Sequence, residues 1–288
     1  MKPAALPPVF LSHGSPMIAL EPGAAGAFMR ELGPAIDAAF GRPRAILVAS
    51  AHTAARMPVL LAASTHAAVY DFGGFDRRLN ALRYDAAGAP EVAQRAAELL
   101  AAAGLDVPTV AQGGLDHGIW TVLRYLYPGA DVPVVPLAFA PHQSPAQQFA
   151  LGAALAPLAE EGVLLMGSGS ITHNLRRAFA SGAGSRPEDP QSMAFREWFR
   201  RESDARAWEA LLDYRRRAPH AVDMHPTDEH LLPWFIAAGA GGAADPAVRL
   251  HASAEMGSIG MDAYAFGVAA PTLAGQLAQA RARPGVTA

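Results

Sequence analysis

Cysteine is absent from the 288-residue chain, which excludes disulfide bonds, thiolate metal ligands and a cysteine nucleophile. Long apolar runs are missing too, since no stretch approaches the ~20 residues of a transmembrane helix, and we expect no membrane partner. The N-terminal segment "PAALPPVFL" is too short and too interrupted by proline for a secretory signal. We therefore expect a cytoplasmic protein.

Positive charge is also scarce. Charged residues make up 17% of the chain, the formal net charge is −3, and the one basic run is Arg215-Arg216-Arg217. Surfaces that bind nucleic acids are usually basic, so we expect no nucleic-acid partner. Three common site motifs are lacking, namely G-x-x-x-x-G-K, H-E-x-x-H and G-x-S-x-G. The "GSGS" at 167–170 has no lysine and does not indicate a phosphate loop.

Short apolar runs alternate with longer alanine-rich segments, and hydrophobic residues reach 51% of the chain. Runs such as "AILVAS" are apolar at successive positions, which is typical of strands covered on both faces. The alternation predicts a single α/β domain over residues 1–288, with a core at about 8–268 and a largely parallel or mixed central sheet flanked by helices. The expected strands are Val9–Ser12, Ala45–Ser50, Val59–Ala63, Val107–Ala111, Val132–Phe139, Val163–Gly167 and Val248–Ala254. The expected helices are Gly23–Phe40, Pro90–Ala103, Trp120–Tyr127, Pro145–Glu160, Gln191–Arg201, Ala205–Arg217, Asp228–Ala238 and Pro271–Arg281, with a loop at Ala180–Pro190.

Three of the expected strands have a histidine at or just past their carboxyl end. His13 follows "VFLS", His52 follows "VASA", and His173 follows the run "VLLMGSGSIT". In open α/β sheets ligands bind beyond the carboxyl ends of the strands, so we expect these imidazoles to converge there. Gly167 and Gly169 are expected to let something bound approach the backbone closely.

Two further histidines have competing interpretations. In "GGLDHGIW", Asp116 suits a helix N-cap, while His117 is a candidate for facing the same cleft. In "HPTDEHLLPWF", Glu229 complements the dipole of an expected helix start with Thr227 as its cap, whereas His230 suits a neutral metal ligand. Neither alternative is decided by the sequence.

Several neutral imidazoles that converge would hold a divalent transition metal ion. Nitrogen ligands suit zinc, and two histidines with a carboxylate suit non-heme Fe(II). The ligand count does not choose between the metals, because carboxylates stand nearby in sequence at Asp71, Asp116, Asp228 and Glu229.

Seven motifs occur in an order similar to that of the class III (LigB-type) extradiol ring-opening dioxygenases, specifically the DOPA-dioxygenase branch. They span residues 8 to 262, nearly the whole chain: "FLSHGSPM", "ASAHT", "YDFGGF", "LDHGIW", "GSGSITHNLR", "PTDEHLLP" and "AEMGSIGM". Thr53 departs from the resemblance, because that branch often carries an aromatic residue there.

The resemblance implies an α/β domain with one divalent metal ion at one end of the sheet. His13, His52 and His230 would be ligands, and His173 would be a fourth ligand or lie beside the metal. His117 would be the histidine on the substrate side, and His117 or His173 would move the catechol proton. Zn²⁺ is the expected bound ion, with Fe²⁺ the alternative for dioxygenase activity.

The expected partners are a catechol such as DOPA, or a related diphenol, and O₂. We predict that Ser15, Phe72 and Trp120 contact the substrate, with core packing as the alternative for the two aromatic residues. A monomer or small homo-oligomer is expected. Two other functions stay open: a zinc hydrolase that activates water in the same cleft, and a non-catalytic scaffold.

Overall fold

The computed structural model describes residues 5–180 and 186–282. Its centre is an eight-stranded sheet with the strand order β6-β3-β7-β2-β8-β1-β12-β9. The four central strands, β7, β2, β8 and β1, run parallel. β12 pairs antiparallel with β1 and β9, and β3 pairs antiparallel with β7 but parallel with β6. The sheet strands are β1 (Val9–Ser12), β2 (Ala45–Ser50), β3 (Val59–Leu61), β6 (Thr109–Val110), β7 (Val134–Ala138), β8 (Val163–Gly169), β9 (Val248–His251) and β12 (Ala263–Ala265).

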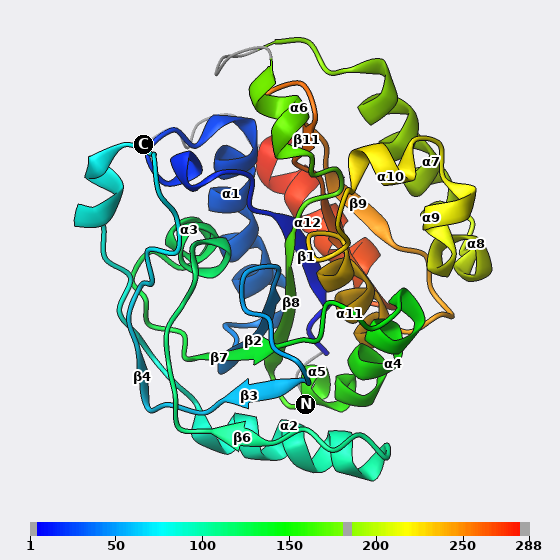
Figure 1. Ribbon diagram of the computed structural model, residues 1–288. Helices are drawn as coiled ribbons and strands as arrows, with labels where there is room; N and C mark the ends of the chain where they lie inside the picture. Colours follow the sequence, from blue (N-terminus) through cyan, green and yellow to red (C-terminus); the bar gives the residue numbers. More distant parts are fainter. Residues whose placement is uncertain (1–4, 181–185, 283–288) are drawn as a thin grey trace.

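Helices cover both faces of this sheet, as the continuous apolar runs predicted (Figure 1). Successive residues of β2 enter different cores: Leu47 and Ala49 pack in one, and Ile46 and Val48 in the other. The first core includes residues of α2 (Pro90–Ala102), α4 (Pro145–Leu155), α7 (Pro190–Asp204) and α11 (Leu232–Gly241). The second includes residues of α1 (Gly23–Phe40), α3 (His117–Leu126) and α12 (Ala270–Ala282). The α/β prediction with a mixed sheet is confirmed.

Several expected helices are divided or displaced. Pro157 separates α4 from α5 (Pro157–Glu160), because proline has no N–H for the preceding turn. The helix expected at Ala205–Arg217 is instead α8 (Trp208–Leu212) and α9 (Tyr214–Arg217), and Arg206 before them has φ of 56°, outside the helical region. The shorter helices are η1 (Pro16–Ala19), η2 (Arg77–Ala81), α6 (Leu175–Ala180) and α10 (Ala221–Met224).

Two small hairpins and β12 have no counterpart among the expected strands. The hairpins are β4 (Thr65–His66) with β5 (Ala86–Ala87), and β10 (Ala254–Glu255) with β11 (Ile259–Gly260). Part of the expected loop, residues 181–185, lies outside the described residues. Within the described ranges, no helix combines the length and apolarity needed to cross a bilayer.

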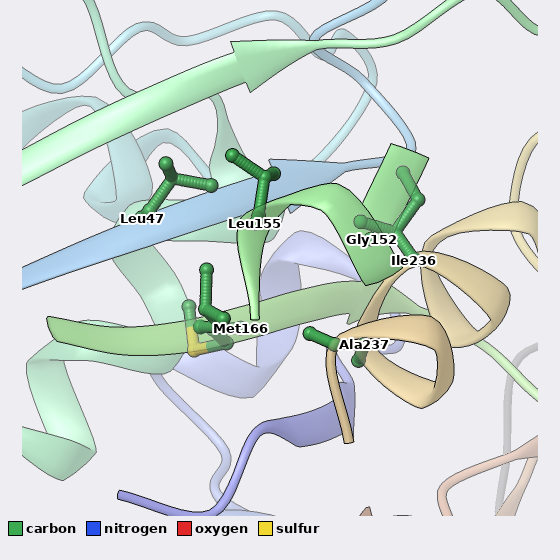
Figure 2. Close-up of a pocket in the computed structure, with 8 residues that line it drawn as sticks. Leu47, Gly152, Leu155, Met166, Ile236 and Ala237 are labelled. Carbon is green, nitrogen blue, oxygen red and sulfur yellow. The ribbon is translucent and has the colours of Figure 1, made fainter. Parts of the chain in front are cut away.

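α4 and α11 pack unusually closely on each other and on the sheet. A Cβ atom added to Gly152 would lie 1.9 Å from the carbonyl oxygen of Ile236, and one added to Gly239 would lie 1.9 Å from that of Phe149. Beside this contact is a void of about 10 Å³ with an almost wholly apolar lining, including Leu47, Leu155 and Ile236 (Figure 2). A void this small and apolar is a packing gap and not a ligand site.

Candidate active site

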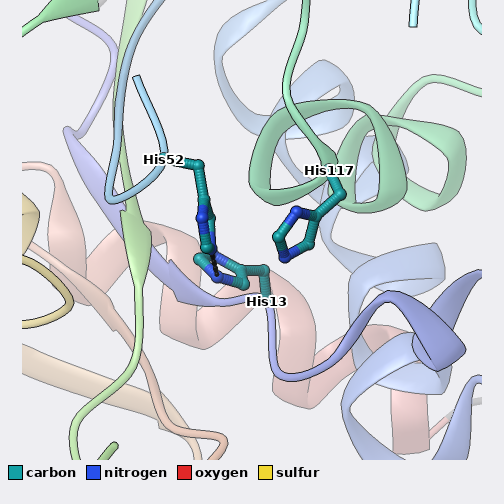
Figure 3. Close-up of side chains that lie close together, drawn as sticks. All are labelled: His13, His52 and His117. Carbon is teal, nitrogen blue, oxygen red and sulfur yellow. Dashed lines mark hydrogen bonds between the residues drawn. The ribbon is translucent and has the colours of Figure 1, made fainter. Parts of the chain in front are cut away.

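Five histidines from separate elements lie close together, and four of them line one pocket. His13 and His52 follow β1 and β2, His173 follows β8, His117 begins α3, and His230 lies in the turn before α11. The ring centroids of His13, His52 and His230 lie 5.0–5.5 Å apart, and that of His117 lies 4.0 Å from that of His52. Figure 3 shows the imidazoles of His13, His52 and His117 turned toward one another. The parallel strands thus bring together the residues that the sequence placed at strand ends.

The orientation of His13 is set by Ser168 of the neighbouring strand β8. The hydroxyl of Ser168 donates to the carbonyl of Gly118 at 2.5 Å, so it accepts from Nδ1–H of His13 at 2.9 Å. A neutral imidazole protonated at Nδ1 has its lone pair on Nε2. This Nε2 lies 3.2 Å from Nε2 of His52.

His117 is held by the carboxylate of Asp71. Nδ1 of His117 lies 3.0 Å from both carboxylate oxygens, so Nε2 carries the lone pair when the ring is neutral. The preceding Asp116 accepts from the backbone N–H of Ile119 at 3.2 Å and caps α3. The two interpretations of "LDHGIW" therefore both hold: Asp116 caps the helix, and His117 faces the cleft.

Asp116 also ties the turn that carries His52 to α3. Its carboxylate accepts from the hydroxyl of Ser50 at 2.8 Å and from that of Thr53. Burial raises the pKa of Asp116, although the two hydroxyl hydrogen bonds oppose the shift. Thr53, the position that departs from the resemblance, thus has a structural role beside the site.

The second half of the site is formed by His173, Glu229 and His230. The rings of His173 and His230 stack with centroids 3.4 Å apart and an interplanar angle of 10°. Nδ1 of His230 lies 3.1 Å from Glu229 Oε1, which also accepts from Thr227 at 2.9 Å. Among the described atoms, the buried Nε2 of His230 has no hydrogen-bond partner.

The turn at 228–231 differs from its prediction. The expected helix Asp228–Ala238 begins only at Leu232, with Pro233 in its first turn, so Glu229 and His230 precede the helix. The backbone N–H of Ser170 donates to the carbonyl of His230 at 2.9 Å. A Cβ atom on Gly169 would lie 2.0 Å from that oxygen. Gly169 therefore admits the chain's own backbone at His230 and not a ligand, which corrects the sequence-based expectation; Gly167 does the same for Pro233, whose carbonyl oxygen would lie 2.3 Å from its Cβ.

Burial favours the neutral form of four of these imidazoles. It lowers the pKa of His52 to about 4 and that of His173 to about 3, and it lowers the pKa values of His13 and His230 well below 6.5. Neighbouring histidines add to the effect in all four cases. Burial also opposes ionisation of Asp71, but hydrogen bonds from His117 outweigh it and lower the pKa of Asp71.

These features fit a metal ion. Donor atoms of His13, His52 and His117 lie within 4.8 Å of one another, and so do those of His173, Glu229 and His230. A neutral imidazole whose Nδ1 is bound to an oxygen presents Nε2 in the form that ligates metals. A cation would give Nε2 of His230 a partner. It would also account for the close approach of Nε2 of His13 to Nε2 of His52.

A pocket of about 310 Å³ opens beside the histidines, a size typical of small-molecule sites. Ser15 and Phe72, two predicted substrate contacts, line it. Trp120 does not: it is fully buried and its Nε1 donates to the carbonyl of Val69 at 3.1 Å. The prediction for Trp120 is wrong, and core packing, its alternative, is correct.

Three supporting residues were given no such role from the sequence: Ser168, Asp71 as the partner of His117, and Glu255 in the pocket wall. A serine inside the apolar strand "VLLMGSG" is a polar group that needs a partner, which was the available signal for Ser168. Nothing in the spacing of Asp71 or Glu255 indicated their positions, because the fold alone brings them to the site.

Comparison with known proteins gives consistent matches over most of the chain. The sequence model of the family described as the catalytic LigB subunit of aromatic ring-opening dioxygenase matches residues 7–267. A 4,5-DOPA dioxygenase extradiol of Beta vulgaris is 36% identical, covering 89% of this chain and 95% of its own. One of the same name from Escherichia coli K12 is 35% identical, covering 91% and 94%. The crystal structure of an uncharacterized Escherichia coli K12 protein has a TM-score of 0.72 at 30% identity, covering 91% of this chain and all of that one.

Proposed function

The chain belongs to the LigB family of aromatic ring-opening dioxygenases, and from this premise we propose that it opens the ring of a catechol, such as DOPA or a related diphenol, with O₂. The observation that carries the proposal is a cluster of five histidines, four of which line a pocket of about 310 Å³ whose wall includes Phe72. The family favours this reaction over the zinc hydrolase and the scaffold. We further propose one catalytic domain over residues 1–288, in the cytoplasm.

His13, His52 and His230 would hold a divalent metal ion, with His173 as a fourth ligand or a group beside it. Lone pairs on Nε2 of His13 and His230 support this assignment, since Nδ1 of each ring is engaged by Ser168 or Glu229. When bound, the ion would orient the two catechol oxygens and stabilise their charge, and as Fe²⁺ it would also relay electrons from the catechol to O₂. Zn²⁺ remains our proposal for the ion bound as isolated, although it has no redox chemistry.

His117 would take the proton from a catechol hydroxyl. Asp71 fixes its ring through Nδ1 at 3.0 Å and stabilises the imidazolium that results, while Nε2 is free to accept. His173, stacked on His230, would be the second group able to hold or return a proton. Phe72, whose ring lies edge-on to His117 at 5.7 Å between centroids, would position the aromatic substrate.

Elemental analysis of protein purified without added metal, paired with a catechol screen, tests the proposal. Metal-free protein is loaded with Fe²⁺ or Zn²⁺ and incubated under air with DOPA and simpler catechols. We expect oxygen uptake and a yellow ring-opened product with Fe²⁺. The proposal fails if every catechol is left intact by both forms, and cleavage of esters or amides by the zinc form would establish the hydrolase in its place.

A further inference from the structure

His225 is a buried histidine to which the proposed reaction gives no role. Its side chain is fully buried, and its Nε2 lies 2.7 Å from the backbone carbonyl oxygen of Ile171. Burial lowers the pKa of His225 to about 4, so the ring is neutral at pH 7. Because a carbonyl can only accept, Nε2 carries the proton and Nδ1 has the lone pair. Among the described atoms this Nδ1 has no partner, which lowers stability, so stability alone does not explain a histidine here.

Two hydrogen bonds in opposite directions join His225 and the residue before it to the segment that carries His173. The backbone N–H of His173 donates to the carbonyl of Met224 at 2.9 Å. The imidazole of His225 donates to the carbonyl of Ile171. The segment is therefore held at His173 itself and just before it, and of these two contacts only the second is made by a side chain.

The ring of His225 is held firmly by two helices. It packs against Phe195 of α7 at 5.5 Å between centroids, and it stands edge-on to Tyr214 of α9 at 6.2 Å. Nη1 of Arg215 donates to the backbone carbonyl of His225 at 3.0 Å. A side chain fixed in this way can determine the position of the group to which it is bound.

The hydrogen bond to Ile171 joins the two elements whose histidines stack in the site. His173 follows β8 and His230 precedes α11, yet their rings lie 3.4 Å apart between centroids. His225 belongs to the segment between α10 and α11 that also contains His230. After burial, the electrostatic interaction with His225 is the largest cause of the lowered pKa of His173, so the two imidazoles are within electrostatic reach of each other.

We propose that His225 is a positioning residue for His173: through the carbonyl of Ile171 it holds the His173 imidazole on that of His230, facing the pocket. The inference rests on the proposed function, because the proton-holding role proposed for His173 is what requires a fixed ring. His225 is outside the pocket lining and acts only through the segment that it holds.

NMR of the histidine side chains tests the contact in the unaltered protein. Long-range ¹H–¹⁵N spectra are recorded on the full-length Zn²⁺-loaded chain labelled with ¹⁵N-histidine, and the signals of His225 and His173 are assigned by their loss in single variants. We expect His225 to be neutral and protonated at Nε2, with a proton that exchanges slowly with water. A proton on Nδ1 alone, or an imidazolium at pH 7, overturns the inference without a functional assay of any variant.

Two substitutions test the consequence for the site. His225→Phe keeps a ring in the packed position and removes the donor, whereas His225→Gln keeps an N–H donor of similar reach. We expect His225→Phe to shift the signals of His173 and to lower kcat for catechol opening by the Fe²⁺ form by about ten- to a hundredfold, the range for groups that orient a site residue. KM should change by less than about twofold, because substrate binding keeps its contacts. His225→Gln should restore most of kcat.

Tyr84→Phe is the matched control, because it also removes a buried hydrogen bond to a backbone carbonyl. The hydroxyl of Tyr84 donates to the carbonyl of Tyr127 at 3.0 Å, and neither residue lines the pocket. Equal kcat in Tyr84→Phe and His225→Phe, with the signals of His173 unchanged in both, overturns the inference. If the unaltered protein opens no catechol, the proposed function is contradicted, and the tautomer of His225 and the signals of His173 still decide whether His225 positions His173.

Discussion

The site has two halves, one formed by His13, His52 and His117 and the other by His173, Glu229 and His230. Different contacts hold the two halves in place. His13 and His117 are oriented by side-chain hydrogen bonds, to Ser168 and Asp71, and both stand on elements packed in the sheet layers. His230 lies in a turn whose place is set by backbone contact with β8 at Gly169. Changes to side chains should therefore weaken the first half gradually, whereas a change to one glycine should displace the second half as a unit.

The largest expected effect comes from removing a proposed ligand. His230→Ala should abolish metal retention and ring opening, because the remaining imidazoles leave the coordination incomplete. His117→Ala should retain the metal and lose activity, since His117 is proposed to act on the substrate. Elemental analysis of both purified variants checks this. If His230→Ala keeps the metal and His117→Ala loses it, the ion is bound by the group formed by His13, His52 and His117 instead.

Gly169→Ala should displace the second half without touching an imidazole. Its Cβ would lie 2.0 Å from the carbonyl oxygen of His230, so the turn must shift. We expect a loss of activity of about a hundredfold, as for a misplacement of about 1 Å, and destabilisation of about 1–3 kcal/mol. Steady-state kinetics and urea unfolding measure the two effects. Gly275→Ala is the control, because nothing lies within 4 Å of the added Cβ; equal behaviour of the two variants would refute the role of Gly169.

Part of the fold, and part of the site, could be predicted from the sequence. The bounds of β1, β2 and α1 agree with their predictions, because each is a clear apolar or alanine-rich segment with breaks at both ends. The convergence of strand-end histidines followed from the topology of parallel strands. β12, the three residues "AYA", has no pattern of its own, and only its pairing with β1 makes it a strand.

The support of the site was not predictable. His13 and Ser168 are 155 residues apart, and no local pattern connects them. The glycines of β8 predict a close approach, but the sequence does not identify the backbone of His230 and Pro233 as their partner, because it does not place the turn before α11 on the strand. Pro233 explains the late start of α11, and this start is what leaves His230 in the turn.

Acidification should lower the stability of the metal-free protein. His52 contributes to this effect in the first half of the site and His173 in the second. Unfolded histidine has a pKa of about 6.5, whereas burial lowers that of His52 to about 4 and that of His173 to about 3. Below pH 6.5 the unfolded chain binds more protons, so stability is fully present above that pH and falls as the pH drops toward 4. The slope is up to about 1.4 kcal/mol per pH unit for His173 and smaller for His52, which is more exposed and therefore screened by solvent. Urea unfolding between pH 7 and 4 measures the slope. His173→Gln should flatten it and His142→Gln, at an exposed position, should not; identical slopes would contradict the buried neutral imidazole.

The smallest effect is expected for Ser168→Ala, which removes the hydrogen bond that fixes the ring of His13 but no proposed ligand. Metal affinity should fall by about tenfold, the lower end for residues that orient a ligand. Competition with a zinc chelator measures the change. Ser12→Ala is a close control: Ser12 is also a buried strand serine, but its hydroxyl has no partner in the described structure. A loss of affinity confined to Ser168→Ala would show that the first half depends on a side-chain contact, and equal losses in both variants would mean that strand packing alone orients His13.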